Sequence, residues 1–315
     1  MQIQTYLIAV DWGTSHLRAY LCKINQDKTL TVIGHVLSLG VNKVETSFEE
    51  TLLTCIAPWT KNLGKLPVFM TGQIGSSIGW KETAYIPCPT LPNAIASSCV
   101  NFTCSGHEIF IVPGLSCRLS NDNYDVMRGE ELQVLGWLQL SPSHRQGSHL
   151  ICLPGTHTKW VLVKEGKIEL FKTAMTGELY DLLSNHSILI QEKSSVFDEG
   201  SFKKGADFTL NSELGSFTHG LFSVRSKQLF GELTSTQANS YLSGLLIGSD
   251  VRAAVNADEW TISTFPHVSV IGNKQLSRLF AQVLNAHGVT TNVFNVNEIT
   301  LLGFNSVYQQ MLTTS

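Results

Sequence analysis

The chain has 315 residues, of which 43% are hydrophobic and 15% are charged, and its formal net charge is −3. This composition predicts a folded protein with a substantial core and excludes a disordered chain. It has neither a basic stripe nor a lysine cluster, which argues against a nucleic-acid partner and against binding to an anionic membrane.

The beginning of the chain predicts an apolar meander followed by a helix. Strands are expected near residues 6–12, 17–24 and 29–37, and a helix over 47–60, where apolar residues recur at helical spacing. The elements expected next are, in chain order, a strand at 67–70, a glycine-rich loop at 71–80, a strand at 108–112 and a helix over 130–140.

A polar segment rich in Pro, Ser and Gly, residues 141–147, is the best candidate for a linker. After it the initial pattern restarts, and this weak internal repeat indicates duplicated lobes. The elements expected there are strands near 149–163 and 167–173, helical segments over 177–255, a strand at 268–272 and helices over 274–286 and 301–311. We predict an N-terminal lobe of residues 1–143 and a C-terminal lobe of residues 144–315, with the last helix as a candidate to pack back on the first lobe.

The seven cysteines are scattered and contain no Cys-x-x-Cys pair. Small buried side chains in a reducing compartment explain them better than disulfides or zinc ligands. The first residues lack the basic segment of a signal peptide, and no apolar stretch has transmembrane length. We therefore expect a cytoplasmic protein.

Two glycine-containing turns directly follow apolar strands. The first contains Gly13, Thr14 and Ser15, and the second contains Gly155, Thr156 and His157. Each sequence reads as strand, Gly-Thr turn and strand, which predicts a hairpin whose backbone N–H groups and hydroxyl suit a phosphate. Neither turn is a Walker A loop, because that motif is absent and a strand follows. Lys159 could also meet phosphate, but strand alternation favours a solvated position.

This pair of turns resembles the sugar kinase/Hsp70/actin superfamily, in which two hairpins clamp the β- and γ-phosphates of ATP. Four segments narrow the resemblance, namely residues 11–19, 127–131, 153–161 and 175–179. In combination they resemble the 2-dehydro-3-deoxygalactonokinase family over nearly the whole chain. The resemblance implies an α/β protein with a two-lobed, actin-like ATPase (ribonuclease H-like) fold, in which duplicated mixed β-sheets flanked by helices border a central cleft.

The implied activity is ATP- and Mg²⁺-dependent phosphorylation of the 6-hydroxyl of 2-dehydro-3-deoxy-D-galactonate in galactonate catabolism. The products would be 2-dehydro-3-deoxy-6-phosphogalactonate and ADP. Two alternatives stay open: a kinase of the same fold for another small sugar or sugar acid, and an actin- or Hsp70-like nucleotide-switched scaffold. The expected partners are the sugar acid and ATP, and the sequence is compatible with a homo-oligomer.

The chemistry of phosphoryl transfer points to carboxylates near the turns. Asp11 would reach the phosphates through Mg²⁺, which needs few protein carboxylates, although a plain Asp-x-Gly hairpin turn is an alternative. The resemblance implies a catalytic carboxylate shortly before the second turn, where Glu130 and Glu131 open a helix and Asp125 is a rival. Helical geometry favours Glu131 as a partly buried base, with Glu130 directed toward the helix start or a metal-bound water. The helix dipole alone also explains carboxylates there.

The loop over residues 72–80 suits a sugar-acid pocket, with backbone donors, serines and an aromatic wall. The side chains and the glycine assigned to it are Gly75, Ser76 and Trp80. In the family an arginine is expected inside this loop, where this chain has Ser77, so another cation must meet the acceptor carboxylate. The candidates are Arg18, Lys81 and Arg128. His16 is a second departure, because a small polar residue is expected there.

The strand-to-helix junction at Gly272 and Asn273 is the candidate adenosine site. A glycine there lets a flat base approach the backbone, and the helix N-terminus adds donors. Ordinary α/β connections have the same form, so this assignment rests mainly on the resemblance.

Overall fold

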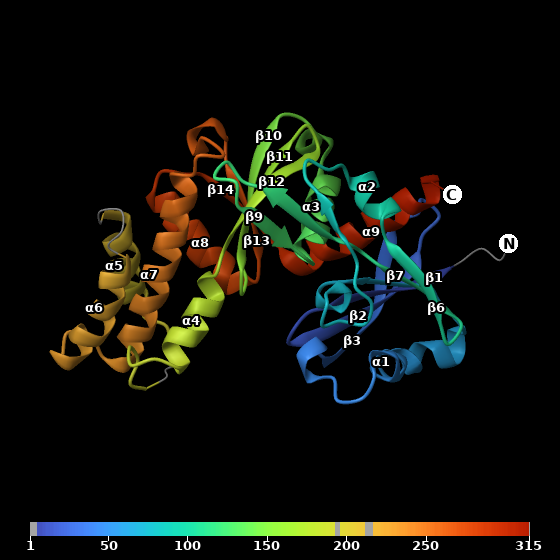
Figure 1. Cartoon of the computed structure of the whole chain (residues 1–315), viewed down its shortest axis with the longest axis horizontal. Helices are drawn as coiled ribbons and strands as arrows, with labels where there is room; N and C mark the ends of the chain where they lie inside the picture. The colour runs from blue at the N-terminus through green and yellow to red at the C-terminus, as the bar shows by residue number, and fades with distance from the viewer. Residues whose placement is uncertain (1–4, 193–195, 212–216, 315) are drawn as a thin grey trace. The chain divides into compact units, whose positions relative to one another are not determined.

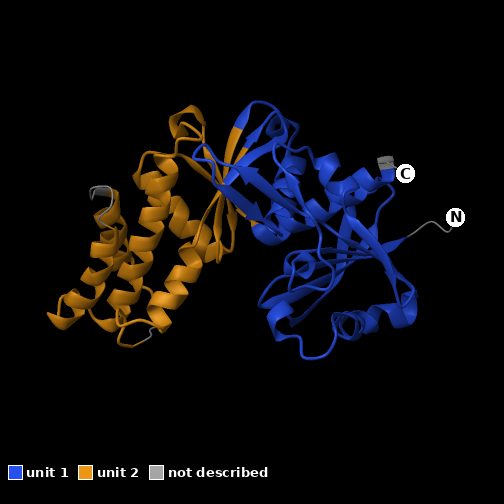
Figure 2. Ribbon diagram, viewed as in Figure 1, with its two compact units in different colours: residues 1–148, 163–171, 296–315 blue, residues 149–162, 172–295 orange. Residues whose placement is uncertain are grey.

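The computed structural model describes residues 5–192, 196–211 and 217–314. The chain divides into two compact units (Figure 2). Unit 1 comprises residues 1–148, 163–171 and 296–315, and unit 2 comprises residues 149–162 and 172–295. The part of our sequence prediction that concerns residues 193–195 and 212–216 lies outside the described residues.

Unit 1 is built on a six-stranded mixed sheet (Figure 1). In spatial order its strands are β3 (Leu30–Leu39), β2 (His16–Ile24), β1 (Tyr6–Trp12), β4 (Val68–Thr71), β7 (His107–Ile111) and β6 (Val100–Cys104). The strands β1, β2 and β3 form an antiparallel meander, whereas β4 lies parallel to both β1 and β7. The central strand β1 is a nearly continuous buried apolar run, as is typical of a strand covered on both faces.

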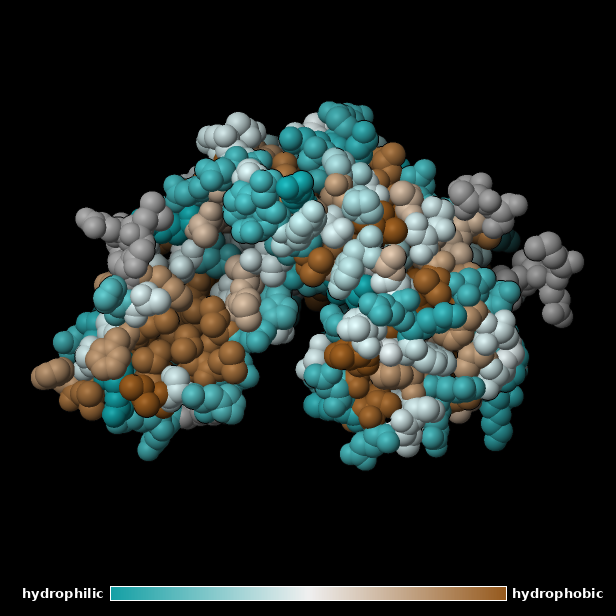
Figure 3. All heavy atoms as spheres, in the orientation of Figure 1, coloured by the Kyte–Doolittle hydropathy of each residue, from teal (hydrophilic) through white to brown (hydrophobic). Residues whose placement is uncertain are grey.

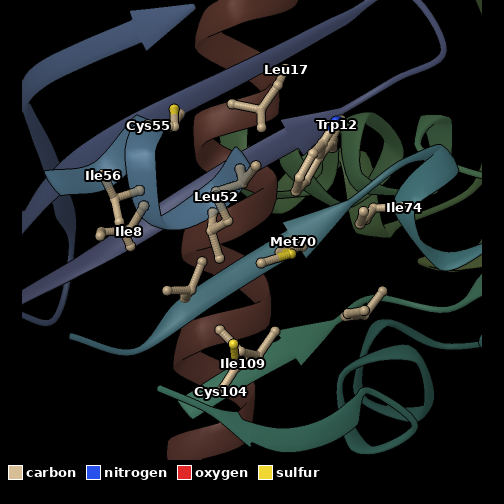
Figure 4. Close-up of a cluster of buried hydrophobic side chains, with 14 of the residues drawn as sticks. Ile8, Trp12, Leu17, Leu52, Cys55, Ile56, Met70, Ile74, Cys104 and Ile109 are labelled. Atoms are coloured by element: carbon tan, nitrogen blue, oxygen red, sulfur yellow. The ribbon is translucent and has the colours of Figure 1, made fainter. Parts of the chain in front are cut away.

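One face of this sheet is covered by α1 (Phe48–Leu63), whose N-cap residue is Ser47. The Ser47 hydroxyl accepts a hydrogen bond from the backbone N–H of Glu50 at 3.0 Å, a helix N-cap. Leu52 and Ile56 turn inward and join a buried cluster with residues of β1, β2 and β4 (Figure 4). This core fixes the strands whose ends carry the first turn.

A smaller sheet and several further helices complete unit 1. The remaining elements are η1 (Val41–Lys43), η2 (Gln73–Gly75), β5 (Tyr85–Pro87), α2 (Pro92–Ser97), β8 (Gly114–Arg118), β9 (Tyr124–Met127), α3 (Glu130–Leu140), η3 (Pro142–Arg145) and α9 (Val296–Thr314). The sheet has the order β5-β8-β9. Helix α9 packs closely on α3, because a Cβ at Gly136 would lie only 1.9 Å from the carbonyl oxygen of Ile299.

The second large sheet repeats the plan of the first. In spatial order its strands are β12 (Lys167–Ala174), β11 (Thr158–Lys164), β10 (Ser148–Leu153), β13 (Val268–Gly272) and β14 (Thr291–Asn295). The short connections between β10, β11 and β12 join antiparallel neighbours, and β13 lies parallel to β10 and β14. A meander followed by parallel strands is the arrangement of β3-β2-β1-β4-β7, which confirms the duplicated sheets.

Helices make up most of unit 2. They are α4 (Thr176–Asn185), α5 (Glu199–Asn211), α6 (Phe217–Leu229), α7 (Ser235–Val255), η4 (Ile262–Thr264) and α8 (Lys274–Ala286). The long helix α7 packs against α4, α5 and α6. Figure 3 shows apolar side chains gathered over part of this helical region. The exposed large hydrophobic residues of α6 and of the turn after it are Phe222, Leu229 and Phe230. Among the described residues, none of the helices combines the length and the apolar character needed to cross a bilayer.

The predicted meanders, the helix after each sheet's first strands and the glycine-rich loop are confirmed, but short elements were not predicted. The structure adds strands β5, β6, β8, β9 and β14 and helix α2. Each is six residues or shorter, so its apolar periodicity gives only a weak signal. The last helix begins at Val296 rather than at residue 301.

Candidate active site

In unit 1, the first candidate site lies where β1 and β4 end. Asp11 stands opposite Arg18 in the β1–β2 pairing, and the two form an ion pair of 3.1 Å between Oδ2 and Nη1. The Asp11 side chain remains 27% exposed. Burial raises the pKa of Asp11, and the charge of Arg18 partly offsets that rise. The carboxylate is therefore accessible while being held in place by its cross-strand partner.

The first turn is held by its carbonyl groups. The N–H of Gly13 donates to the carbonyl of His16 at 2.9 Å, while Val41 and Asn42 donate to the carbonyls of Gly13 and Thr14. Thr14 and Ser15 are exposed. Within the described part of the chain, the backbone N–H groups of these two residues donate no hydrogen bond. Such outward N–H groups can bind an anion.

The segment after β9 brings the candidate bases to the same region. Gly129 has a φ of +108°, which an L side chain rarely adopts, and it lies against Gly72 at the end of β4. The first turn of α3 is thereby placed beside β4. Gly72 in turn neighbours Asp11, because a Cβ at Gly72 would lie 3.5 Å from Oδ1 of Asp11.

Glu131 is completely enclosed, with 0% exposure, whereas partial burial was expected. Its Oε1 accepts from the Thr71 hydroxyl at 3.1 Å, and its Oε2 accepts from the Gly129 N–H at 2.7 Å. Burial, and next the charge of Glu130, raise the pKa of Glu131 to about 8. The enclosure arises because β4 covers the helix start, which helical spacing alone cannot reveal.

Glu130 and Asp125 are more accessible. Glu130 is half-buried at the start of α3, and its Oε2 accepts from the backbone N–H of Arg128 at 3.2 Å. That contact directs its carboxylate toward the helix start. Asp125 lies on β9, where its Oδ1 accepts from the N–H of Val126 at 2.7 Å.

The residues predicted for the sugar-acid pocket divide into two groups. Trp80 packs edge-on against Phe102, with ring centroids 5.3 Å apart, and the exposed Lys81 places Nζ 4.7 Å from the centre of the same ring. The Ser76 hydroxyl donates to the carbonyl of Gln73 at 2.7 Å. By contrast, buried Gly75 lies against the guanidinium of Arg128, which points toward this loop.

In unit 2, the second turn is supported from behind by the start of α4. The N–H of Glu178 donates to the carbonyl of Thr156 at 2.9 Å, and the Glu178 carboxylate contacts Nε2 of His157. Gly177 fits tightly here, because a Cβ would lie 2.4 Å from the carbonyl oxygen of Gly155. Within the described part of the chain, the backbone N–H groups of Gly155 and Thr156 donate no hydrogen bond.

The prediction for Lys159 was wrong, because this side chain is only 4% exposed. It lies in β11, of which all residues but the last are buried, so that strand alternation no longer distinguishes a solvated face.

A buried acid anchors the start of α4. Asp250 of α7 accepts from Nε1 of Trp160 at 2.8 Å and from the hydroxyl of Thr176. Burial raises the pKa of Asp250 to about 6, although these hydrogen bonds lower it. Asp250 thus links the strand after the second turn to the helix that supports the turn.

The candidate adenosine junction lies beside the second turn. Strands β10 and β13 are parallel neighbours, so that they end at the same edge, and a Cβ at Gly272 would lie 3.2 Å from the carbonyl oxygen of Pro154. Asn273 is the N-cap of α8, and its side chain accepts from the N–H of Leu276 at 2.9 Å. The structure therefore brings the second turn and this junction together within unit 2.

The sequence interpretation gave no role to several residues that hold these sites together. They are Thr71, Thr83, Gly177, Glu178 and Asp250. Gly177 and Glu178 stood in a quoted motif, and that motif was the available signal. The sequence contains no comparable signal for Asp250, because an acidic residue in a helix is ordinarily exposed to solvent.

A sequence profile for the family described as 2-keto-3-deoxy-galactonokinase matches residues 11–307. The chain is 32% identical over 308 residues to "Probable 2-dehydro-3-deoxygalactonokinase DgoK1" of Rhizobium meliloti (strain 1021), covering 96% of each chain. It is 37% identical over 250 residues to the 2-dehydro-3-deoxygalactonokinase of Escherichia coli (strain K12), covering 78% of each.

A crystal structure from Sinorhizobium meliloti, provisionally assigned as a 2-dehydro-3-deoxygalactonokinase, matches with a TM-score of 0.85 at 32% identity, covering 97% of this chain and 99% of that one. Component A of (R)-2-hydroxyglutaryl-CoA dehydratase from Acidaminococcus fermentans matches with a TM-score of 0.53 at 12% identity, covering 98% of this chain and 100% of that one, which shows likeness of fold alone. The predicted two-lobed, actin-like ATPase fold is confirmed. The chain belongs to the 2-keto-3-deoxy-galactonokinase family and is a carbohydrate kinase.

Proposed function

We propose that this kinase transfers the γ-phosphoryl group of ATP to the 6-hydroxyl of 2-dehydro-3-deoxy-D-galactonate, yielding 2-dehydro-3-deoxy-6-phosphogalactonate and ADP in galactonate catabolism. Family membership supports the reaction. The observation that carries the assignment of residues is the meeting of Asp11, Gly72 and the start of α3 in unit 1. A candidate metal ligand and candidate bases thereby belong to one region.

The two turns would bind the phosphates through their outward N–H groups. Those N–H groups belong to Thr14 and Ser15 in the first turn and to Gly155 and Thr156 in the second. Gly13, whose own N–H donates to the His16 carbonyl, and His157 would complete the two phosphate-binding turns. Phosphoryl transfer needs positioning and charge stabilisation more than covalent chemistry from the protein, and backbone donors supply both. Gly272 and the N-terminus of α8, capped by Asn273, would receive the adenosine.

The donor set at Asp11 fits Mg²⁺ that is held mainly by the nucleotide. One oxygen of Asp11 is engaged by Arg18, and the side chain is partly exposed. Among the described residues, no group of three or more His, Cys, Asp or Glu side chains is arranged to hold a metal ion. Mg²⁺ keeps several waters and binds one or two carboxylates plus phosphate oxygens. When bound, it would neutralise charge that develops on the phosphoryl group.

Glu130 is the better candidate for the group that takes the proton from the acceptor hydroxyl. Glu131 is fully enclosed, both its oxygens accept hydrogen bonds, and a pKa of about 8 leaves it mostly protonated at neutral pH. Glu130 is half-buried at the same helix start. We therefore assign Glu131 to holding α3 on β4 and Glu130 to general base catalysis, with Asp125 as the alternative.

The test is an ADP-release assay with ATP, Mg²⁺ and a panel of 2-keto-3-deoxy sugar acids and ordinary hexoses. We expect the highest kcat/KM with 2-dehydro-3-deoxy-D-galactonate. A higher value with another sugar or sugar acid would contradict the proposed acceptor, and slow ADP release that no acceptor stimulates would favour a nucleotide-switched scaffold. We also propose a cytoplasmic location, where ATP is available and thiols stay reduced. Association into a homo-oligomer remains a prediction.

A further inference from the structure

Arg128 is a buried cation whose hydrogen-bond partners are neutral. Arg128 is 7% exposed, and its two Nη atoms donate hydrogen bonds to the hydroxyl and the carbonyl of Thr83. The guanidinium lies over the ring of Tyr85, 4.4 Å from its centre. The buried Nε has no hydrogen-bond partner within the described chain. Arginine stays charged in proteins, so this site contains uncompensated positive charge.

Nearby carboxylates do not neutralise this charge. Among the described residues, none forms an ion pair with Arg128. Glu130 accepts from the backbone N–H of Arg128 rather than from its guanidinium. A buried donor without a partner is unfavourable unless a ligand or water satisfies it.

Two glycines, Gly75 and Gly114, leave room for the guanidinium and for the ring of Tyr85. A Cβ at Gly75 would lie 3.1 Å from Nη1 of Arg128, and one at Gly114 would lie 2.7 Å from Cε1 of Tyr85. The absence of a side chain at these two positions lets the Arg128 guanidinium and the Tyr85 ring lie directly beside the loop that the sequence predicts as the sugar-acid pocket.

The other candidate cations are engaged elsewhere. Arg18 pairs with Asp11, and Lys81 extends over Phe102. Arg128 also stands two positions before Glu130, so one short segment carries both the unpaired cation and the proposed base.

We infer that Arg128 binds the carboxylate of the acceptor and thereby makes the kinase specific for a sugar acid over a neutral sugar; this inference rests on the proposed function. The free N–H groups of a guanidinium form a planar fork that matches a carboxylate. The loop arginine expected from the family resemblance is replaced by Ser77, and Arg128 supplies the counter-charge from behind the same loop.

The test compares 2-dehydro-3-deoxy-D-galactonate with its C1 carboxamide, which has the same shape without the charge. In Arg128→Met we expect kcat/KM for the acid to fall by about a hundredfold, mainly through KM, with little change for the carboxamide. Arg128→Lys restores charge without the fork and should recover part of the preference. The matched control is Arg118→Met, which removes an exposed arginine of β8 and should leave both values unchanged.

An Arg128→Met variant that keeps the wild-type preference for the acid overturns the inference. So does an equal loss for acid and carboxamide, which is the signature of a merely structural arginine. If Arg128→Met does not fold, the test uses Arg128→Lys. An unchanged preference of that variant for the acid over the carboxamide also contradicts recognition of the carboxylate by the guanidinium. Wild-type enzyme that does not phosphorylate the acid at all would contradict the proposed function instead.

Discussion

The two turns have the same place in the two large sheets and differ in what surrounds them. The first follows a strand that ends in Asp11, which pairs with Arg18 across the hairpin. The second follows Leu153 and Pro154, and its polar support comes from α4 through Glu178. Both turns thus have outward backbone donors and a carboxylate nearby, but Asp11 lies on the strand that leads into the first turn, whereas Glu178 lies on α4 behind the second and contacts His157.

This difference separates two tasks. We propose that the first turn takes the metal ion through Asp11, and that the second turn, which the N-terminus of α4 supports, binds anions. We therefore expect changes near the first turn to act on kcat, and changes in the second to act on nucleotide affinity.

The largest loss of kcat should come from replacing the proposed base, Glu130. This change tests whether the catalytic group lies near the first turn. Glu130→Gln should lower kcat by about a thousandfold, since it removes proton acceptance and leaves size and hydrogen bonding nearly intact. KM for ATP should change little. Steady-state kinetics of Glu130→Gln, Glu131→Gln and Asp125→Asn provide the measurement. A greater loss in Glu131→Gln or Asp125→Asn would move the base to that residue.

Asp11→Asn should lower kcat by at least about a hundredfold without unfolding the protein, because it removes charge that helps to hold a phosphate-bound cation. Asp27→Asn is the control, as Asp27 lies in the exposed turn between β2 and β3. The variants are compared across a Mg²⁺ titration. Near-normal kcat for Asp11→Asn at saturating Mg²⁺ would show that the two turns do not differ as argued.

Gly155→Val should weaken ATP binding by about tenfold, because a stiff β-branched side chain would occupy the space in front of the turn that is meant for phosphate. Gly200→Val, at the start of α5 in open surroundings, is a control within the same unit. Calorimetry gives the affinities, and circular dichroism confirms folding. Unchanged affinity in a folded Gly155→Val protein would remove the second turn from the nucleotide site.

The smallest effect is a pH dependence of stability. Because the pKa of Glu131 is raised to about 8 in the folded protein, the folded state binds the extra proton, and stability falls as pH rises toward 8. The slope is at most about 1.4 kcal/mol per pH unit. Asp250, with a pKa raised to about 6, is mostly ionised above pH 6.5, so unfolding is best compared between pH 6.5 and 8. Glu131→Gln should flatten this slope relative to the wild-type protein, and equal slopes would contradict the raised pKa of Glu131.

The sequence allowed prediction of both hairpins and turns, because apolar strands beside Gly-Thr steps are local features. It could not predict the enclosure of Glu131, which depends on Thr71 of a distant strand. Helical spacing identified one face of α3 but not what covers that face. The prediction that Lys159 is solvated was wrong for a related reason, since β11 is buried on both faces. Arg128 could be named among three cations, but its lack of a counter-ion became visible only in three dimensions.

The proposed reaction is tested most directly by identifying its product. Purified enzyme, ATP, Mg²⁺ and 2-dehydro-3-deoxy-D-galactonate are incubated, and the phosphorylated acid and ADP are quantified by mass spectrometry and phosphorus NMR. We expect one ADP for each phosphorylated acid, with the phosphate on the 6-oxygen. ADP formation that is independent of the acid, or a phosphate on another oxygen, would contradict it.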